Sequence, residues 1–120
     1  MTACGDTFLG GAEVHGGDHL WVVINDPQAH DGTAVFVNVS TVREKSDTTC
    51  LLRRGDNPFI KHDSYVRFRS AKKALVEELD ALIKARHLRP HQPADAALVV
   101  RIRAAASAAL EFPGDLRPLL

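Results

Sequence analysis

The chain has 120 residues, of which 45% are hydrophobic, and its 15 basic and 15 acidic side chains balance. This length predicts one domain whose core needs neither a metal nor a disulfide, so Cys4 and Cys50 are expected to be free thiols. No apolar run approaches the roughly 20 residues of a membrane span, and the first residues lack the pattern of a secretion signal. We therefore expect a cytoplasmic protein that makes no membrane contact.

Charge is unevenly distributed along the chain. Residues 1–41 contain five acids and no Lys or Arg, whereas residues 42–75 contain nine basic and four acidic side chains. A local excess of positive charge can attract a phosphate backbone. It can equally be a solvated face that compensates the acidic first third, and the charge alone does not separate these two interpretations.

Two predicted strands, residues 19–25 and 34–41, organise the first third of the chain. Both are rich in β-branched and aromatic residues and contain no proline, and turn-forming residues 26–32 connect them. A short strand at about residues 7–9 and a glycine-rich loop precede them. Because both strands carry polar residues at their ends, we expect a site where those ends converge.

The middle of the chain predicts further strands. Residues 49–53 form a candidate strand in which Cys50 packs inward. Residues 64–69 alternate, which places Tyr65, Arg67 and Arg69 on one face and two apolar side chains on the other. Residues 71–76 are consistent with either a sixth short strand or the entry to a helix.

Apolar residues recur at helical spacing from residue 77 onward. They predict helices at about residues 77–87 and 94–109, with a break at Pro90 and a start near Pro93. Residues 111–120 contain two prolines and a glycine and predict a loose tail. The fold class is therefore mainly β with α: a single domain over residues 1–110, with a strongly bent antiparallel sheet or barrel of five to six strands at about residues 5–76, followed by two C-terminal helices that cover an open face.

The order of these elements resembles the PemK/MazF-like toxins of toxin–antitoxin pairs. The similarity rests on a Gly5-Asp6-Thr7 start, the apolar strand that begins at His19, the pair Ser40-Thr41 closing the next strand, and a later Ser64-Tyr65-Val66-Arg67 segment. The resemblance covers about residues 5–88, and the second helix is an addition to it.

The resemblance implies an SH3-like barrel, a homodimer, and cleavage of single-stranded RNA without a metal or other cofactor. It also implies an antitoxin partner whose extended acidic segment lies in the groove. In the matching positions, Thr41 (or Ser40) carries the hydroxyl and Arg67 supports the phosphate. His19 takes the position of the arginine in the family's Arg-Pro and could act as a base or an acid, since histidine titrates near neutral pH.

The substrate-binding residues of this interpretation are Ser40, Arg43, Tyr65 and Arg69, with Tyr65 as a stacking surface for a base. The proposed catalytic and binding residues also have structural interpretations. His19 can be a strand-edge histidine, and the hydroxyls of Ser40 and Thr41 can simply end a strand. Arg67 and Arg69 can belong to a solvated sheet face. The replacement of Arg-Pro by His19-Leu20 also leaves open a catalytically inactive SH3-like module that binds a peptide or a nucleic acid. A third possibility is a regulatory partner that acts through the alanine-rich helix.

Overall fold

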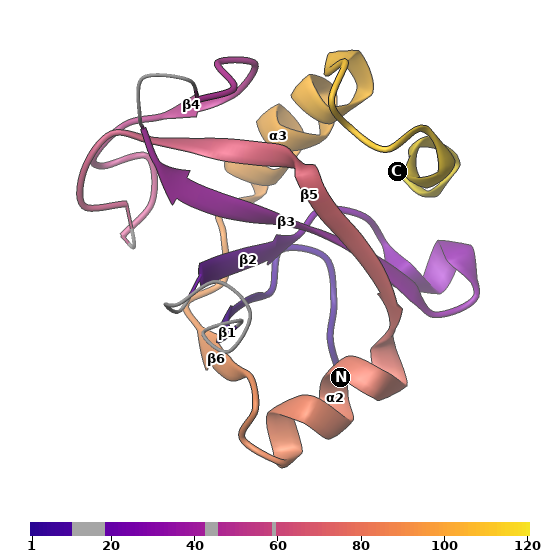
Figure 1. The fold of residues 1–120 in the computed structure, drawn as a ribbon. Helices are drawn as coiled ribbons and strands as arrows, with labels where there is room; N and C mark the ends of the chain where they lie inside the picture. The colour runs from indigo at the N-terminus through magenta and orange to yellow at the C-terminus, as the bar shows by residue number, and fades with distance from the viewer. Residues whose placement is uncertain (11–18, 43–45, 59) are drawn as a thin grey trace.

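The computed structural model describes residues 1–10, 19–42, 46–58 and 60–120. All of the described strands except β6 precede the first α-helix, and the two α-helices come late (Figure 1). In chain order the elements are β1 (Thr7–Gly10), β2 (His19–Val23), the 3₁₀ helix η1 (Pro27–His30), β3 (Thr33–Thr41), β4 (Leu51–Leu52), β5 (Ser64–Leu75), α2 (Val76–Lys84), β6 (Arg89–His91), α3 (Ala96–Ala108) and the 3₁₀ helix η2 (Gly114–Leu119).

The strands form one curled antiparallel sheet in the order β4-β5-β3-β2-β1-β6. The two strands that the sequence placed at the centre do lie there as β2 and β3. The predicted fold class is confirmed: a strongly bent antiparallel sheet with helices. The described sheet has the shape of a half-barrel with β4 and β6 at its edges. The turn before β3 is η1, where the Asp26 carboxylate accepts a hydrogen bond from the Gln28 amide.

Strand β5 is continuous where the sequence left a break. Asn38 of β3 pairs with Arg67, and Phe36 pairs with Lys72, so β5 carries extra residues between these two pairs. These residues form a bulge, which bends a strand without ending it. An odd number of steps separates Arg67 from Lys72, yet the bulge returns both side chains to the same face of the sheet.

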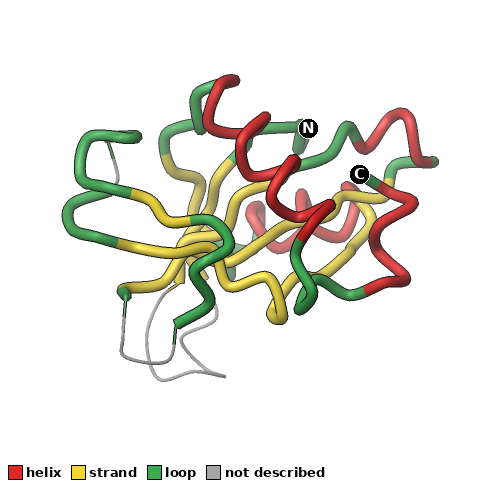
Figure 2. The backbone as a smooth tube through the Cα atoms, turned by 90° about the horizontal axis from the view of Figure 1, so that it is seen from above, coloured by secondary structure: helices red, strands yellow, loops and turns green. Residues whose placement is uncertain are grey.

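The larger of the two cores lies on one face of the sheet and is covered by α3. Figure 2 shows α3 crossing over the strands. Inward side chains of the central strands meet three buried residues of the helix, Leu98, Ile102 and Ala106. Cys50 and Ile60 also belong to this core, as the sequence predicted for Cys50.

The C-terminal residues complete the larger core, so the predicted loose tail at residues 111–120 is wrong. Phe112 is 2% and Leu116 is 3% exposed, and the Phe112 ring meets the Phe68 ring edge-on at 6.0 Å. The buried Asn25 amide donates a hydrogen bond of 3.0 Å to the Leu119 carbonyl. Helix α3 ends at Ala108, ahead of Pro113, and the chain then folds back as η2, which begins at Gly114.

The smaller core lies on the opposite face and is covered by α2. It is aromatic: the Phe36 ring packs edge-on against Phe8 at 5.6 Å and against Trp21 at 5.5 Å. Val76 and Leu79 of α2 close it. Trp21 is 5% exposed, in agreement with its predicted role as a core residue.

Strand β6 lies between the two α-helices and was not predicted. Helix α2 ends at Lys84, ahead of the predicted end, and Arg86 takes a left-handed φ of 65°. The chain then runs beside β1, where Phe8 pairs with Pro90. A proline is tolerated there because β6 is an edge strand. No helix in the described part of the chain is both long and apolar enough to cross a membrane.

Candidate active site at one end of the sheet

The polar ends of three neighbouring strands lie side by side at one end of the sheet. Ser40 and Thr41 close β3 and pair with Tyr65 and Ser64 at the start of β5. Leu20 pairs with Val39, so the register continued by one residue sets His19 beside Ser40. The convergence of strand ends expected from the sequence is therefore present.

Four of the predicted site residues share one face at this end. Successive side chains of a strand point to opposite faces, and directly paired residues point to the same face. The register therefore places an imidazole, a hydroxyl, a phenol and a guanidinium on the face of the smaller core. We call this row, formed by His19, Ser40, Tyr65 and Arg67, the strand face; all four are half-buried.

Hydrogen bonding on the strand face orients a hydroxyl and leaves one guanidinium nitrogen without a partner among the described residues. The Ser40 hydroxyl donates to Asn38 Oδ1 at 2.6 Å, so the lone pairs of its oxygen remain free to accept. Arg67 is paired with Asn38, and its Nε is buried with no hydrogen-bond partner within the described residues. A buried, unsatisfied guanidinium donor favours an acceptor such as a phosphoryl oxygen.

A second cation lies further along the same face. Lys72 sits with its ammonium 5.6 Å from the centre of the Trp21 ring, a cation–π contact that the β5 bulge makes possible. Arg67 and Lys72 thus place two positive charges on the strand that carries Tyr65. This arrangement supports an anionic ligand running along β5.

Thr41, by contrast, lies on the face of the larger core, opposite to His19 and Arg67. The expectation that Thr41, His19 and Arg67 meet in one groove is therefore wrong. Ser40 and Thr41 are consecutive, so strand alternation sends their hydroxyls to different faces. The Thr41 hydroxyl instead contacts His62 Nε2 at 2.8 Å.

The Thr41–His62 pair opens into a small cavity, which we call the loop pocket because the segment between β4 and β5 forms one wall. Its volume is about 210 Å³. Apolar side chains from three strands form much of the wall, and hydroxyl, imidazole and ammonium groups complete it. The lining residues are Leu9, Leu20, Val39, Ser40, Thr41, Ile60, Lys61, His62 and Ser64.

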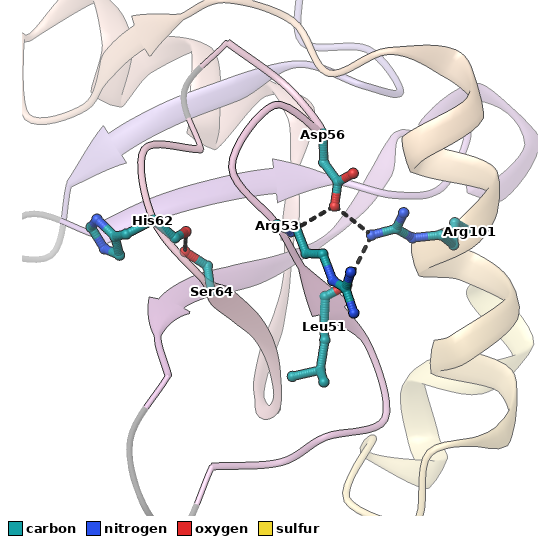
Figure 3. A network of polar contacts seen from close by, with 6 residues as sticks. All are labelled: Leu51, Arg53, Asp56, His62, Ser64 and Arg101. Atoms are coloured by element: carbon teal, nitrogen blue, oxygen red, sulfur yellow. Dashed lines mark hydrogen bonds and ion pairs between the residues drawn. The ribbon is translucent and has the colours of Figure 1, made fainter.

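The segment that carries Lys61 and His62 is tied to α3. Figure 3 shows the Arg53 amide and the Arg101 guanidinium meeting at the Asp56 carboxylate, with His62 pointing away from them. The distances to Asp56 Oδ2 are 2.7 Å from Arg53 N and 3.0 Å from Arg101 Nη2. These bonds lower the pKa of Asp56 below its usual value, and the bond from the Arg53 amide contributes most.

Of the other predicted binding residues, Arg69 lies in the bulge of β5, exposed to solvent. Arg43 lies outside the described residues. Sequence reasoning missed Lys61 and His62, because the Thr41–His62 contact joins residues 21 positions apart and no spacing motif marks it. Burial raises the pKa of the Cys50 thiol, which keeps it protonated and unsuited to be a nucleophile.

The described residues offer no cluster of three or more His, Cys, Asp or Glu side chains that could hold a metal ion. The groups gathered at this end of the sheet can instead do proton transfer and charge stabilisation. An imidazole, two hydroxyls and a guanidinium are the types that acid–base chemistry on a phosphodiester needs.

Comparison with known proteins finds likeness in structure. No family model and no curated protein matches the sequence. An endoribonuclease solved in complex with its cognate antitoxin, from a mycobacterial species, shares 16% identity at a TM-score of 0.61, over 94% of this chain and 98% of that one. A chain of the MazE–MazF complex from Deinococcus radiodurans shares 13% identity at a TM-score of 0.56, over 93% and 97%.

These likenesses extend over nearly the whole length of both chains. The protein therefore has the MazF-like fold that the PemK/MazF resemblance implied, which confirms the prediction at the level of fold. At such low identity the likeness says nothing of individual site residues, so these rest on the geometry described above.

Proposed function

We propose that this protein is the toxin of a type II toxin–antitoxin pair, and that it cleaves single-stranded RNA at the strand face without a metal ion. One observation carries the proposal: on three adjacent strands, the register gathers His19, Ser40, Tyr65 and Arg67 on one face. The fold shared with an endoribonuclease of a toxin–antitoxin complex supports it.

In the proposed reaction, His19 removes the proton from a ribose 2′-hydroxyl, and the oxygen attacks the adjacent phosphorus. The bond to the 5′-oxygen breaks, and that oxygen takes a proton from water at this half-exposed face. Arg67, whose Nε has no hydrogen-bond partner among the described residues, stabilises the negative charge of the phosphorane with its guanidinium. The products are a 2′,3′-cyclic phosphate and a 5′-hydroxyl.

Two further residues hold the substrate in this scheme. The Ser40 oxygen accepts a hydrogen bond from a ribose hydroxyl, because its own proton is given to Asn38. Tyr65 stacks with a base, a contact that tolerates any base identity. Arg69, exposed in the bulge, contacts the phosphate backbone further along, and Arg43 is proposed for the same role from the sequence alone.

The proposed partners follow from the same charges. An antitoxin with an extended acidic segment would neutralise Arg67 and Lys72 by lying along β5, where it excludes RNA. We also propose a homodimer and a cytoplasmic location, as the resemblance implies.

The test is to incubate the purified protein with mixed single-stranded RNA in a chelator and to analyse the fragment ends. Discrete fragments ending in a cyclic phosphate, together with growth arrest on overexpression, are expected. Intact RNA at micromolar protein would contradict the proposal. RNA that is bound but left intact would instead support the inactive binding module.

A further inference from the structure

The loop pocket lies at the same end of the sheet as the proposed cleavage site, and Ser40 is the one lining residue that also takes part in the proposed reaction. The loop pocket combines polar groups in a defined geometry. The Thr41 hydroxyl contacts the His62 imidazole at 2.8 Å, and Ser64 donates to the His62 carbonyl at 2.9 Å, which fixes the backbone that carries the ring. Such convergence of polar groups on an apolar cavity is typical of ligand sites.

The size of the loop pocket limits what it can hold. A volume of about 210 Å³ is below the roughly 300 Å³ at which sites for drug-sized ligands begin. Leu9, Leu20, Val39 and Ile60 give it apolar walls, which a bare phosphate ion would leave unused. The volume is large enough for a small ring system such as a single nucleobase.

Charge around the loop pocket favours an anionic ligand. None of the described residues that line it is acidic, and Lys61 is at its wall. Lys61 also lines two neighbouring hollows, one of them together with Arg54 and the other beside His91. A ligand whose flat part enters the pocket can therefore place an attached phosphate against this ammonium.

The wall that carries Lys61 and His62 is anchored by three separate contacts. Arg101 binds Asp56, the Asp95 amide at the start of α3 donates to Asn57 Oδ1 at 3.1 Å, and Ile60 is 3% exposed in the larger core. Because α3 and its first residues hold Asp56 and Asn57 and the larger core holds Ile60, this wall of the loop pocket is in place before any ligand arrives, which reduces the entropic cost of binding.

We propose that the loop pocket is a subsite for one nucleotide of the RNA. The base lies between the apolar side chains, its polar edge meets the Thr41 hydroxyl and the His62 imidazole, and its phosphate pairs with Lys61. The subsite selects one base of the substrate, since a hydrogen-bonding pocket rejects a base that leaves these groups unpaired. This inference rests on the proposed function for its biological role but not for its test.

The test measures binding of the four ribonucleoside 5′-monophosphates separately, with the His62 ring followed by NMR and affinity by calorimetry. Inorganic phosphate and ribose 5-phosphate serve as probes without a base. The variants Thr41→Val and His62→Phe remove one polar group each with little change of shape, and Lys61→Met removes the charge. Lys73→Met, an exposed lysine of β5 that pairs with Val35, is the matched control.

One nucleotide should bind in preference to the others and shift the His62 resonances. Each pocket variant should weaken it about tenfold, as expected for the loss of one hydrogen bond to a charged or polar partner, and Lys73→Met should not. Equal binding of inorganic phosphate would overturn the base pocket. So would nucleotide binding that the three pocket variants leave unchanged, or no binding by a protein that still cleaves RNA. Selective binding by a protein that cleaves no RNA would uphold the subsite and reject the proposed nuclease.

Discussion

The two faces of the sheet differ in how far they are covered at the end where β3 closes. On one face, the larger core, α3 and the C-terminal residues close over the strands and leave a small pocket at Thr41. On the other, α2 covers only the aromatic part, and the row from His19 to Arg67 stays half-exposed. The side chains of consecutive β3 residues therefore point to different faces: Ser40 to the strand face, although it also borders the loop pocket, and Thr41 to the face where it contacts His62.

This difference shows that adjacency in sequence is a poor guide to adjacency in a site built on a sheet. A one-residue step along β3 moves a hydroxyl from the face of His19 and Arg67 to the opposite face, where it contacts His62. Substitutions on the two faces should accordingly have different effects. Changes in the larger core should lower stability, changes on the strand face should lower turnover, and changes in the loop pocket should weaken substrate binding.

The largest effect is expected on stability, from Phe112→Ala. The ring is 2% exposed and packs against Phe68, so its loss should reduce the free energy of unfolding by about 3–5 kcal/mol. Cleavage per folded molecule should stay unchanged, because the strand face lies on the other side of the sheet. Denaturant unfolding measures the first quantity, and Leu110→Ala, at a 98% exposed position, is the control that should change neither.

Next in size is the effect of Arg67→Met on the cleavage rate. Loss of one group that stabilises charge in a transition state costs about 10² to 10³ in turnover. Single-turnover cleavage of a labelled RNA measures it. Lys73→Met removes a positive charge from the same strand and should retain the wild-type rate; an equal loss in both variants would mean that only the overall charge matters.

A smaller effect separates the two hydroxyls of β3. Ser40→Ala should lower turnover about tenfold, the cost of one hydrogen bond of roughly 1.4 kcal/mol. Thr41→Val should leave turnover unchanged and raise KM, since its hydroxyl faces the loop pocket. Steady-state kinetics on one RNA distinguishes them, and a loss of turnover confined to Thr41→Val would reverse our assignment of the faces.

The smallest effect concerns Asp56 and pH. Its pKa is lowered in the folded protein by the Arg53 amide and by Arg101. The stabilisation is therefore present above the ordinary carboxyl pKa of about 3.9 and is lost as the pH falls through the lowered value. Asp56→Asn should cost about 1 kcal/mol or less at pH 7, as for an exposed ion pair, and the cost should shrink as the pH falls below the ordinary carboxyl pKa. Urea unfolding over a series of pH values tests this, and a cost that stays constant or grows as the pH falls would contradict it.

The sequence predicted the two central strands and the two α-helices, because β-branched runs and helical periodicity are local signals, and the MazF-like fold was implied by the resemblance to the PemK/MazF-like toxins. It did not predict the bulge in β5, which depends on pairing with β3, or β6, which contains Pro90 and has too few residues to show a period. The tail was misjudged because its prolines outweighed Phe112 and Leu116, whose burial depends on a core formed elsewhere in the chain.

In the candidate site, too, local features were predicted and features that depend on the folded chain were not. The residue types expected from the chemistry are present on the strand face, and His19, Ser40, Tyr65 and Arg67 were all named from the sequence. The assignment of Thr41 to the same face was wrong because it ignored strand alternation. His62 could not be found, since a loop after β4 brings it to Thr41 only in the folded chain.

The proposal depends most on a phosphate of the RNA meeting the guanidinium of Arg67 on the strand face. The direct measurement is the NMR signal of the Arg67 Nε–H in the presence of a single-stranded RNA with 2′-O-methyl groups, which binds without being cleaved. A downfield shift with slower exchange on RNA addition, absent with Arg67→Met, is the result we predict. RNA that binds while this signal remains unchanged would contradict a cleavage site on the strand face.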